Sequence, residues 1–364
     1  MVSRPVASVH QAGDELMARS WERRIERIRR DRSSGASTLL SYGIEAARLF
    51  LAEAHRLPPD RFAAQLKRFT LLLVTSQPSM AVFLTLLNVL WLACEKGART
   101  PSATPSAWRR VHAALVRYAD GIDRGLLAVV RRAAALVKPR SLVLTYSSST
   151  VVQLALWRAM AVGRSFEVVC SESRPVQEGV ALARRLSDLG ISVHLVVDAG
   201  LTEWVKEADL LLLGADAILP DVVVNKVGTE PLLQAARHAG VPAYILADSS
   251  KWLPAPLARF WWVRDEDPTQ VLRPIPPNVR VHNRYFGAST LSLVTGVVWE
   301  GGVARPGEVN ERIARLPASR LLPDFLARGY PLGHETLNRH DHPAPALGTR
   351  TAKDTIFRAL DRSI

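Results

Sequence analysis

A carboxylate, an amide and an ammonium group follow one another closely in the second half of the chain. Asp216 ends the run Ala208-Asp-Leu-Leu-Leu-Leu-Gly-Ala-Asp216, and Asn225 and Lys226 follow in Val223-Val-Asn-Lys-Val-Gly-Thr229. The apolar runs are typical of buried strands, which would deliver these polar groups to one end of a sheet. A carboxylate that exchanges protons, beside groups that hold hydroxyls and anions, suits a phosphorylated polyol.

Other predicted strands also end in polar residues. Short β-branched runs at 141–145, 166–170, 191–197, 209–213 and 242–246 alternate with helical patterns, which indicates a parallel sheet with helical crossovers. Ligands of such sheets bind beyond the carboxyl ends of the strands, where helices begin. The side chains to examine there are Tyr146, Ser147, Ser148, Ser149, Arg174, Asp198, Asp216, Asp248 and Lys251. No GxGxxG or P-loop fingerprint follows any strand, so we expect no nicotinamide and no other cofactor.

These groups also have structural interpretations. Asp216 could cap the turn that follows its strand, and Asn225 could cap a helix beginning near residue 228. Arg174 could pair with Glu172, and Lys251 could be an ordinary surface lysine. The serines at 147–149 could simply cap the helix expected at 150–162.

The elements that must position these residues fall into two parts. The first 136 residues are predicted to be almost entirely helical, with breaks near 31–37, 57–60, 76–78 and 99–106. We therefore expect an α/β protein. An N-terminal helical domain (1–138) would precede a Rossmann-like domain with a mainly parallel sheet (139–330), followed by a C-terminal tail (331–364). In the tail, His334, His340 and His342 could bind a metal, but such a segment is more often disordered, and we predict no metal.

Composition narrows the class of protein. With 364 residues, 48% hydrophobic and 22% charged, the chain has ample material for a globular core. Cys94 and Cys170 form no CxxC pair, which favours a reducing, cytoplasmic compartment. No segment reaches the ~20 clean apolar residues of a membrane span, and the opening residues lack the core of a signal peptide.

The net charge of +13 is weak evidence for RNA or another acidic partner. The arginine-rich run at 19–32 includes Glu22 and Glu26, and it spaces Trp21, Ile25 and Ile28 along one helix face. A solvated helix face is therefore the preferred interpretation.

Seven stretches, in this order, resemble one superfamily. They are 145–150, 171–179, 190–198, 214–218, 224–229, 241–251 and 283–286. The superfamily joins the alpha, beta and delta subunits of eukaryotic translation initiation factor 2B to the isomerases of methylthioribose 1-phosphate and ribose 1,5-bisphosphate. The resemblance implies a helical domain before a Rossmann-like one, a phosphorylated sugar or nucleotide as ligand, and homodimers formed through the second domain.

The resemblance also implies roles for single residues. The isomerases pair a cysteine with an aspartate; Asp216 matches the aspartate, and Ser147 stands at the cysteine position. A hydroxyl is far less acidic than a thiol, whose reference pKa is ~8.5, and no sequence neighbour obviously activates Ser147. The family's Arg-Gly-Ala turn reads Ser34-Gly35-Ala36 with Arg32 displaced, and its Arg-Pro-Thr helix start reads Gln77-Pro78-Ser79. Each loss removes a bidentate phosphate contact.

The sequence thus predicts a diverged sugar-phosphate site whose catalytic pair is Asp216 and Ser147. The expected substrate-binding residues are Arg32, Gly35, Ala36, Gln77, Ser148, Ser149, Arg174, Asn225, Lys226 and Lys251. Two functions stay open: an isomerase that converts an aldose 1-phosphate to a ketose, and a non-catalytic subunit or regulator of the initiation-factor type. The missing thiol favours the second function, and the retained aspartate favours the first.

Overall fold

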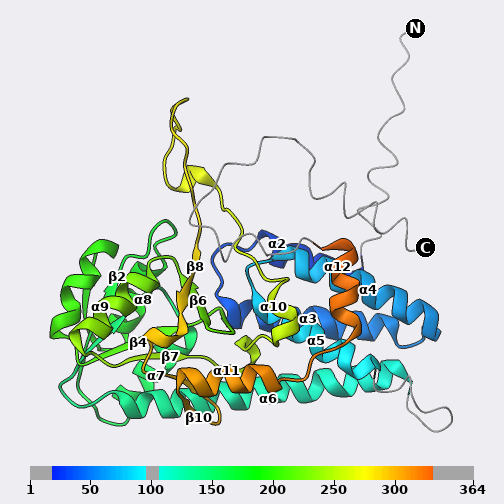
Figure 1. The fold of residues 1–364 in the computed structure, drawn as a ribbon, viewed down its shortest axis with the longest axis horizontal. Helices are drawn as coiled ribbons and strands as arrows, with labels where there is room; N and C mark the ends of the chain where they lie inside the picture. The colour runs from blue at the N-terminus through cyan, green and yellow to red at the C-terminus, as the bar shows by residue number, and fades with distance from the viewer. Residues whose placement is uncertain (1–18, 96–105, 331–364) are drawn as a thin grey trace.

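One end of the molecule is made of helices alone, and the other holds a sheet with helices packed around it (Figure 1). The computed structural model describes residues 19–95 and 106–330. The predicted α/β class and mainly parallel sheet are confirmed. None of the described helices is long and apolar enough to cross a membrane.

The N-terminal helices follow the breaks expected from the sequence. They are α2 (Ser20–Arg30), α3 (Ala36–Ala54), α4 (Pro59–Ser76), α5 (Ala81–Glu95) and α6 (Ala107–Leu136). Helix α4 begins with Pro59 in its first turn, where a missing N–H costs nothing. Helix α5 is apolar on nearly every face and is buried almost all round by its neighbours.

The arginine-rich helix α2 has the face predicted for it. Trp21, Ile25 and Ile28 are almost completely buried in the helical core. On its other faces, Arg24 pairs with Glu45, and Arg29 and Arg30 pair with Glu26. The run therefore serves the fold as an amphipathic helix.

The main sheet has the strand order β10-β9-β7-β4-β1-β2-β3, parallel except for β10. Its strands are β1 (Leu142–Thr145), β2 (Glu167–Ser171), β3 (Ser192–Val196), β4 (Leu210–Gly214), β7 (Ala243–Leu246), β9 (Gly296–Trp299) and β10 (Gly302–Ala304). The crossover helices are α7 (Thr150–Ala161), α8 (Glu178–Asp188) and α9 (Thr229–Ala239). The first five strands coincide with the predicted β-branched runs.

The structure also has a second, antiparallel sheet, which the sequence pattern did not predict as a separate sheet. It has the order β5-β6-β8, from β5 (Ala217–Leu219), β6 (Val222–Lys226) and β8 (Phe286–Thr290). Strand β6 ends in Asn225 and Lys226, so this small sheet carries them toward the main one.

Helix α6 joins the two ends of the molecule. It runs beneath both halves in Figure 1, and the predicted boundary near residue 138 lies just after it. Its first half packs in the helical core through Val111 and Leu115, and its second half packs under the sheet through Val129 and Ala133.

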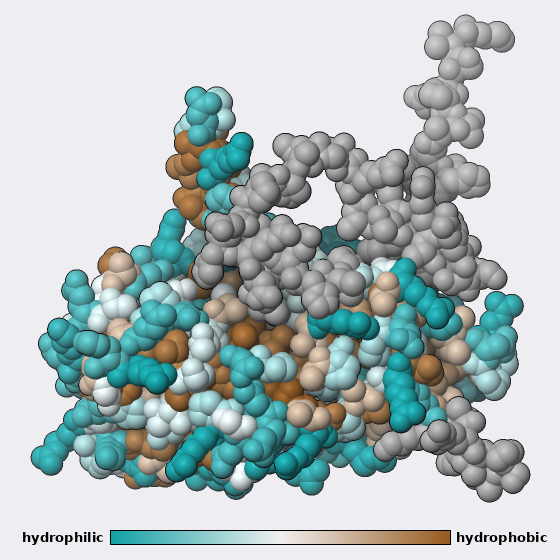
Figure 2. Space-filling model, in the orientation of Figure 1, coloured by the Kyte–Doolittle hydropathy of each residue, from teal (hydrophilic) through white to brown (hydrophobic). Residues whose placement is uncertain are grey.

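The remaining segments cover the two cores. They are α10 (Ala255–Ala258), α11 (Pro306–Arg315), α12 (Leu321–Gly329), and the short 3-10 turns η1 (Asp198–Glu207), η2 (Ser249–Lys251), η3 (Pro268–Gln270) and η4 (Leu291–Leu293). Between α10 and β8, the middle of the segment 264–284 projects from the body as an arm, while Arg264 and Glu266 at its base pack against the body (Figure 1). Apolar side chains gather on this arm (Figure 2), where Val271, Leu272 and Ile275 are exposed.

Candidate functional site

A cavity of about 460 Å³ lies at the carboxyl edge of the strands, where the start of α3 meets the sheet domain. Its volume is in the range of small-molecule sites, roughly 300–1,000 Å³. The predicted site residues that line it are Arg32, Gly35, Ala36, Ser147, Ser148, Ser149, Asp216, Asn225, Lys226 and Lys251. Gln77 and Arg174 do not line it.

Three helices begin at this cavity. The first turns of α3, α7 and α8 contribute Ala36, Thr150 and Glu178 to its wall. The Ala36 N–H at the start of α3 donates to the Asp216 carboxyl group, and at the start of α8 the N–H groups of Gly179 and Val180 donate to backbone carbonyls. The start of α7 has no side-chain cap among the described residues. An uncapped helix N-terminus carries free donors and a partial positive charge, so this end of the cavity favours anions.

Close backbone approach shapes the floor of the cavity. A Cβ at Gly214, the last residue of β4, would lie 2.4 Å from Ser149 Oγ. Only glycine allows the loop after β1 to pass so near the end of β4. This contact places the serine loop beside Asp216.

Asp216 is a partly buried carboxyl group on one wall of the cavity. Burial raises its pKa to about 6, while the charge of Lys251 and the Ala36 N–H act in the opposite direction. Near neutral pH such a group exists in both protonation states, which suits a general acid or base. Lys251 itself is only 4% exposed, so it is a buried lysine of the site and not a surface one.

The structure supplies a partner for Ser147 that sequence reasoning missed. Ser147 Oγ donates to Glu178 Oε1 at 2.8 Å, and Lys226 Nζ lies 2.8 Å from the same oxygen. No neighbour in the sequence obviously activates Ser147, but the start of α8 brings a carboxylate 31 residues away into hydrogen-bond contact with it. Glu178 stands directly before Gly179 in one of the stretches that carry the resemblance, and this position was the available signal.

A second residue that sequence reasoning missed lies about two turns further along the same face of α8. Arg185 Nη2 donates to Ser148 Oγ at 2.8 Å, and its Nε donates to Gln153 Oε1 at 3.0 Å. Glu178, Ala181 and Arg185 all line the cavity, at the i, i+3, i+7 spacing of one helix face. That spacing could have identified Arg185 from the sequence.

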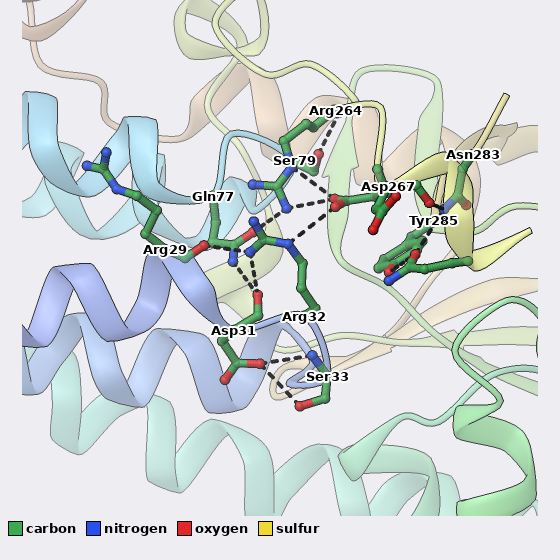
Figure 3. Close-up of polar contacts among 12 residues, drawn as sticks. Arg29, Asp31, Arg32, Ser33, Gln77, Ser79, Arg264, Asp267, Asn283 and Tyr285 are labelled. Atoms are coloured by element: carbon green, nitrogen blue, oxygen red, sulfur yellow. Dashed lines mark hydrogen bonds and ion pairs between the residues drawn. The ribbon is translucent and has the colours of Figure 1, made fainter. Parts of the chain in front are cut away.

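Arg32 and Gln77 lie together at the turn between α2 and α3 (Figure 3). Gln77 Nε2 donates to the carbonyls of Ile28 at 2.8 Å and Asp31 at 2.6 Å, so it fixes this turn and does not reach the cavity. Arg32 lines the cavity, but its Nε lies 3.5 Å from Glu266 Oε2 at the base of the arm. Its guanidinium is thus engaged by protein groups.

Two other predicted residues are held by structural contacts. The Arg174 side chain is exposed, and its backbone N–H donates to Asp198 Oδ2 at 2.7 Å in the loop after β2. Asn225 Nδ2 donates to Thr229 Oγ1 at 3.2 Å, and Asn225 also lies in the cavity wall. Asn225 is not the cap of α9, because the N-cap residue of this helix is Gly228.

Within residues 19–95 and 106–330, no group of three or more His, Cys, Asp or Glu side chains could hold a metal ion. His334, His340 and His342, the histidines considered for a metal, lie outside the described residues. The polar side chains that line the cavity carry carboxyl, hydroxyl, amide and cationic groups.

Comparisons with known proteins identify the family of the chain. The model of the initiation factor 2 subunit family matches residues 32–306. A Pyrococcus horikoshii protein named putative translation initiation factor eIF-2B subunit 2-like is 27% identical over 283 residues, covering 78% of this chain and 95% of that protein. The ribose 1,5-bisphosphate isomerase of Archaeoglobus fulgidus is 23% identical over 285 residues, covering 77% and 88%.

Solved structures share the fold. The translation initiation factor eIF-2B of Pyrococcus horikoshii has a TM-score of 0.67 at 26% identity, covering 80% of this chain and 98% of that one. The tetrameric eIF2B-beta2-delta2 complex of C. thermophilum has a TM-score of 0.65 at 18% identity, covering 85% and 99%. The second likeness concerns the fold alone.

Proposed function

The chain belongs to the initiation factor 2 subunit family, and from this we propose that its cavity binds a phosphorylated sugar of the aldose 1-phosphate class. One observation carries the proposal. A carboxyl group with a pKa of about 6 and the uncapped start of α7, with the Arg185 guanidinium beside it, open on the same cavity. A polyol needs the first and a phosphate needs the second.

The chemical groups in the cavity walls favour one orientation of the ligand. The start of α7, with Ser148 and Arg185, is the phosphate end, because donors and a guanidinium meet there. The sugar hydroxyls face Asp216, Lys226 and Lys251, where carboxyl and ammonium groups alternate. A relative named ribose 1,5-bisphosphate isomerase supports a ligand of this class.

Titration calorimetry with ribose 1,5-bisphosphate and methylthioribose 1-phosphate tests the proposal. Replacing Arg185 by Gln should weaken binding about 10- to 100-fold, because a charge-assisted contact of ~1.5–3 kcal/mol is lost. The matched control is Arg184→Gln, an exposed neighbour on α8 that does not line the cavity. Absence of binding to both sugar phosphates and to inorganic phosphate would contradict the proposal.

A second candidate is a non-catalytic subunit or regulator that binds a sugar phosphate or nucleotide and acts through assembly. It is favoured by Ser147 at the cysteine position of the resembling isomerases, and by a relative named as an eIF-2B subunit 2-like factor. It includes a homodimer, which light scattering at micromolar concentration would detect. Conversion of either sugar phosphate to a ketose, followed by NMR, would exclude the purely non-catalytic role.

A further inference from the structure

Glu178 has an unsatisfied oxygen in an otherwise well-connected site. Its Oε1 accepts from Ser147 and pairs with Lys226, both at 2.8 Å. Its Oε2 is buried and has no hydrogen-bond partner among the described residues. Burying a carboxylate oxygen without a partner is costly, so such an atom calls for a functional explanation.

The contact fixes what Ser147 can offer to a ligand. A serine hydroxyl has one proton to donate, and here that proton is directed at Glu178. The lone pairs that remain on Ser147 Oγ can only accept. A ligand hydroxyl placed against Ser147 must therefore be the donor, which is the direction in which a proton would leave the ligand.

The backbone around this contact is held in uncommon conformations. Ser147 has φ 66° and Gln177, directly before Glu178, has φ 60°, both in the left-handed region that non-glycine residues seldom adopt. Such conformations are strained and persist where the surroundings enforce them, often at functional sites. Lys226, which is 3% exposed, offsets the charge of Glu178 from a fixed position.

We propose that Ser147 and Glu178 form a proton relay that deprotonates a hydroxyl of the bound sugar, with Lys226 balancing the carboxylate charge. This proposal rests on the proposed function, because it concerns the same cavity and an aldose 1-phosphate. Ser147 touches the substrate, and Glu178 acts through it. The relay allows the serine to accept a proton from the sugar hydroxyl, because Glu178 takes up the serine's own proton; a serine hydroxyl alone is a poor proton carrier.

The reaction that this relay serves is internally balanced. Asp216 gives its proton to the ring oxygen as the bond from that oxygen to C1 breaks. A hydride moves from C2 to C1, and the C2 hydroxyl proton passes to Ser147 Oγ while the serine proton passes to Glu178. The products are a ketone at C2, a methylene at C1 that keeps its phosphate, and a hydroxyl at the former ring oxygen. Solvent returns the proton from Glu178 to Asp216, so no outside oxidant or reductant is needed.

The test compares Glu178→Gln and Ser147→Ala with wild type in turnover of ribose 1,5-bisphosphate and methylthioribose 1-phosphate. Each variant should lower kcat about 100-fold or more while the Kd for the sugar phosphate changes less than about threefold, because the relay moves a proton and is not the main source of affinity. The control is Glu203→Gln, an exposed glutamate of η1 away from the cavity. Ser147→Ala keeps the Glu178–Lys226 pair, so it provides a folded variant even where Glu178→Gln leaves the buried Lys226 unpaired and unfolds.

A double-mutant cycle separates the relay from a merely structural role. Combining Glu178→Gln with Ser147→Ala should cost little more than either change alone, since both interrupt one path. In a Ser147→Cys background, Glu178→Gln should cost about 10-fold or less, because a thiol ionises without help. Equal and additive losses in every background would overturn the relay. Tight binding by wild type without conversion of either sugar phosphate would also overturn it and leave the proposed function standing, whereas absence of binding would end both.

Discussion

Asp216 makes the folded protein sensitive to pH. Its pKa is raised from 3.8 to about 6, chiefly by burial, so ionising it costs more in the folded chain than in the unfolded one. Between these two values the folded state binds more protons than the unfolded state. The free energy of unfolding contributed by this group therefore falls as the pH rises from about 4 to about 6, and it stays low above that range.

Replacing Asp216 by Asn should remove this penalty. We expect Asp216→Asn to raise the free energy of unfolding by about 1–3 kcal/mol near pH 7.5, from ~1.4 kcal/mol for each unit of pKa. The gain should shrink to nearly nothing below about pH 4, where both states of the wild type hold the proton. Urea unfolding over this pH range measures it, with the exposed Asp188→Asn as control. A loss of stability at pH 7.5 would contradict the expectation.

The residues that the strand pattern placed at one edge of the sheet do lie around one cavity. Asp216, Lys226 and Lys251 end or follow strands, and the edge of a parallel sheet brings such residues together whatever the details of packing. Glu178 and Arg185 lie on a helix whose rotation about its axis is set by tertiary contacts, so the strand pattern did not reveal them. Gln77 was assigned through the resemblance alone, and it hydrogen-bonds to carbonyls of the α2–α3 turn instead.

At the scale of elements, the junction of β6 and α9 sets the geometry of the site. Gly228 begins this junction with φ 96°, and a Cβ there would lie 3.0 Å from the hydroxyl of Tyr146. That hydroxyl donates to the Val227 carbonyl at 2.6 Å. The loop after β1 is thereby tied to the end of β6, which keeps Lys226 close to Glu178.

Gly228→Ala should strain this junction. We expect a loss of about 1–3 kcal/mol in the free energy of unfolding, because alanine is disfavoured at this φ and its Cβ would press on Tyr146. Gly121→Ala is the matched control: it lies inside α6 with open space around it, and it should gain up to about 1 kcal/mol. Denaturant titration of both variants gives the comparison. Equal stabilisation by the two changes would show that the φ of Gly228 imposes no constraint.

The pairing of elements was harder to predict than their positions. Strands β1, β2, β3, β4 and β7 follow local β-branched patterns, and their positions were predicted within about two residues. The small sheet depends on pairing Val224 of β6 with Ala288 of β8, which are far apart in sequence. No local pattern specifies such a long-range contact, so this sheet was visible only in the structure.

At the scale of the whole molecule, α6 links the helical core to the core beneath the sheet. Leu115 is 1% exposed among the helices, and Val129 is buried completely among α7 and the strands. Since one continuous helix serves both, unfolding either core removes packing from the other. We expect the two parts of the chain to unfold in one transition, although the site lies where they meet.

Two core substitutions on α6 test this coupling. Leu115→Ala should lower the free energy of unfolding by about 2–5 kcal/mol and Val129→Ala by about 1–3 kcal/mol, and both should shift the same calorimetric peak. Leu127→Ala, on the same helix but 60% exposed, is the control and should change little. Two resolved peaks, each moved by only one of the core substitutions, would mean that the cores unfold independently. The cavity, which takes walls from α3 and from the sheet loops, would then depend on an interface weaker than either core.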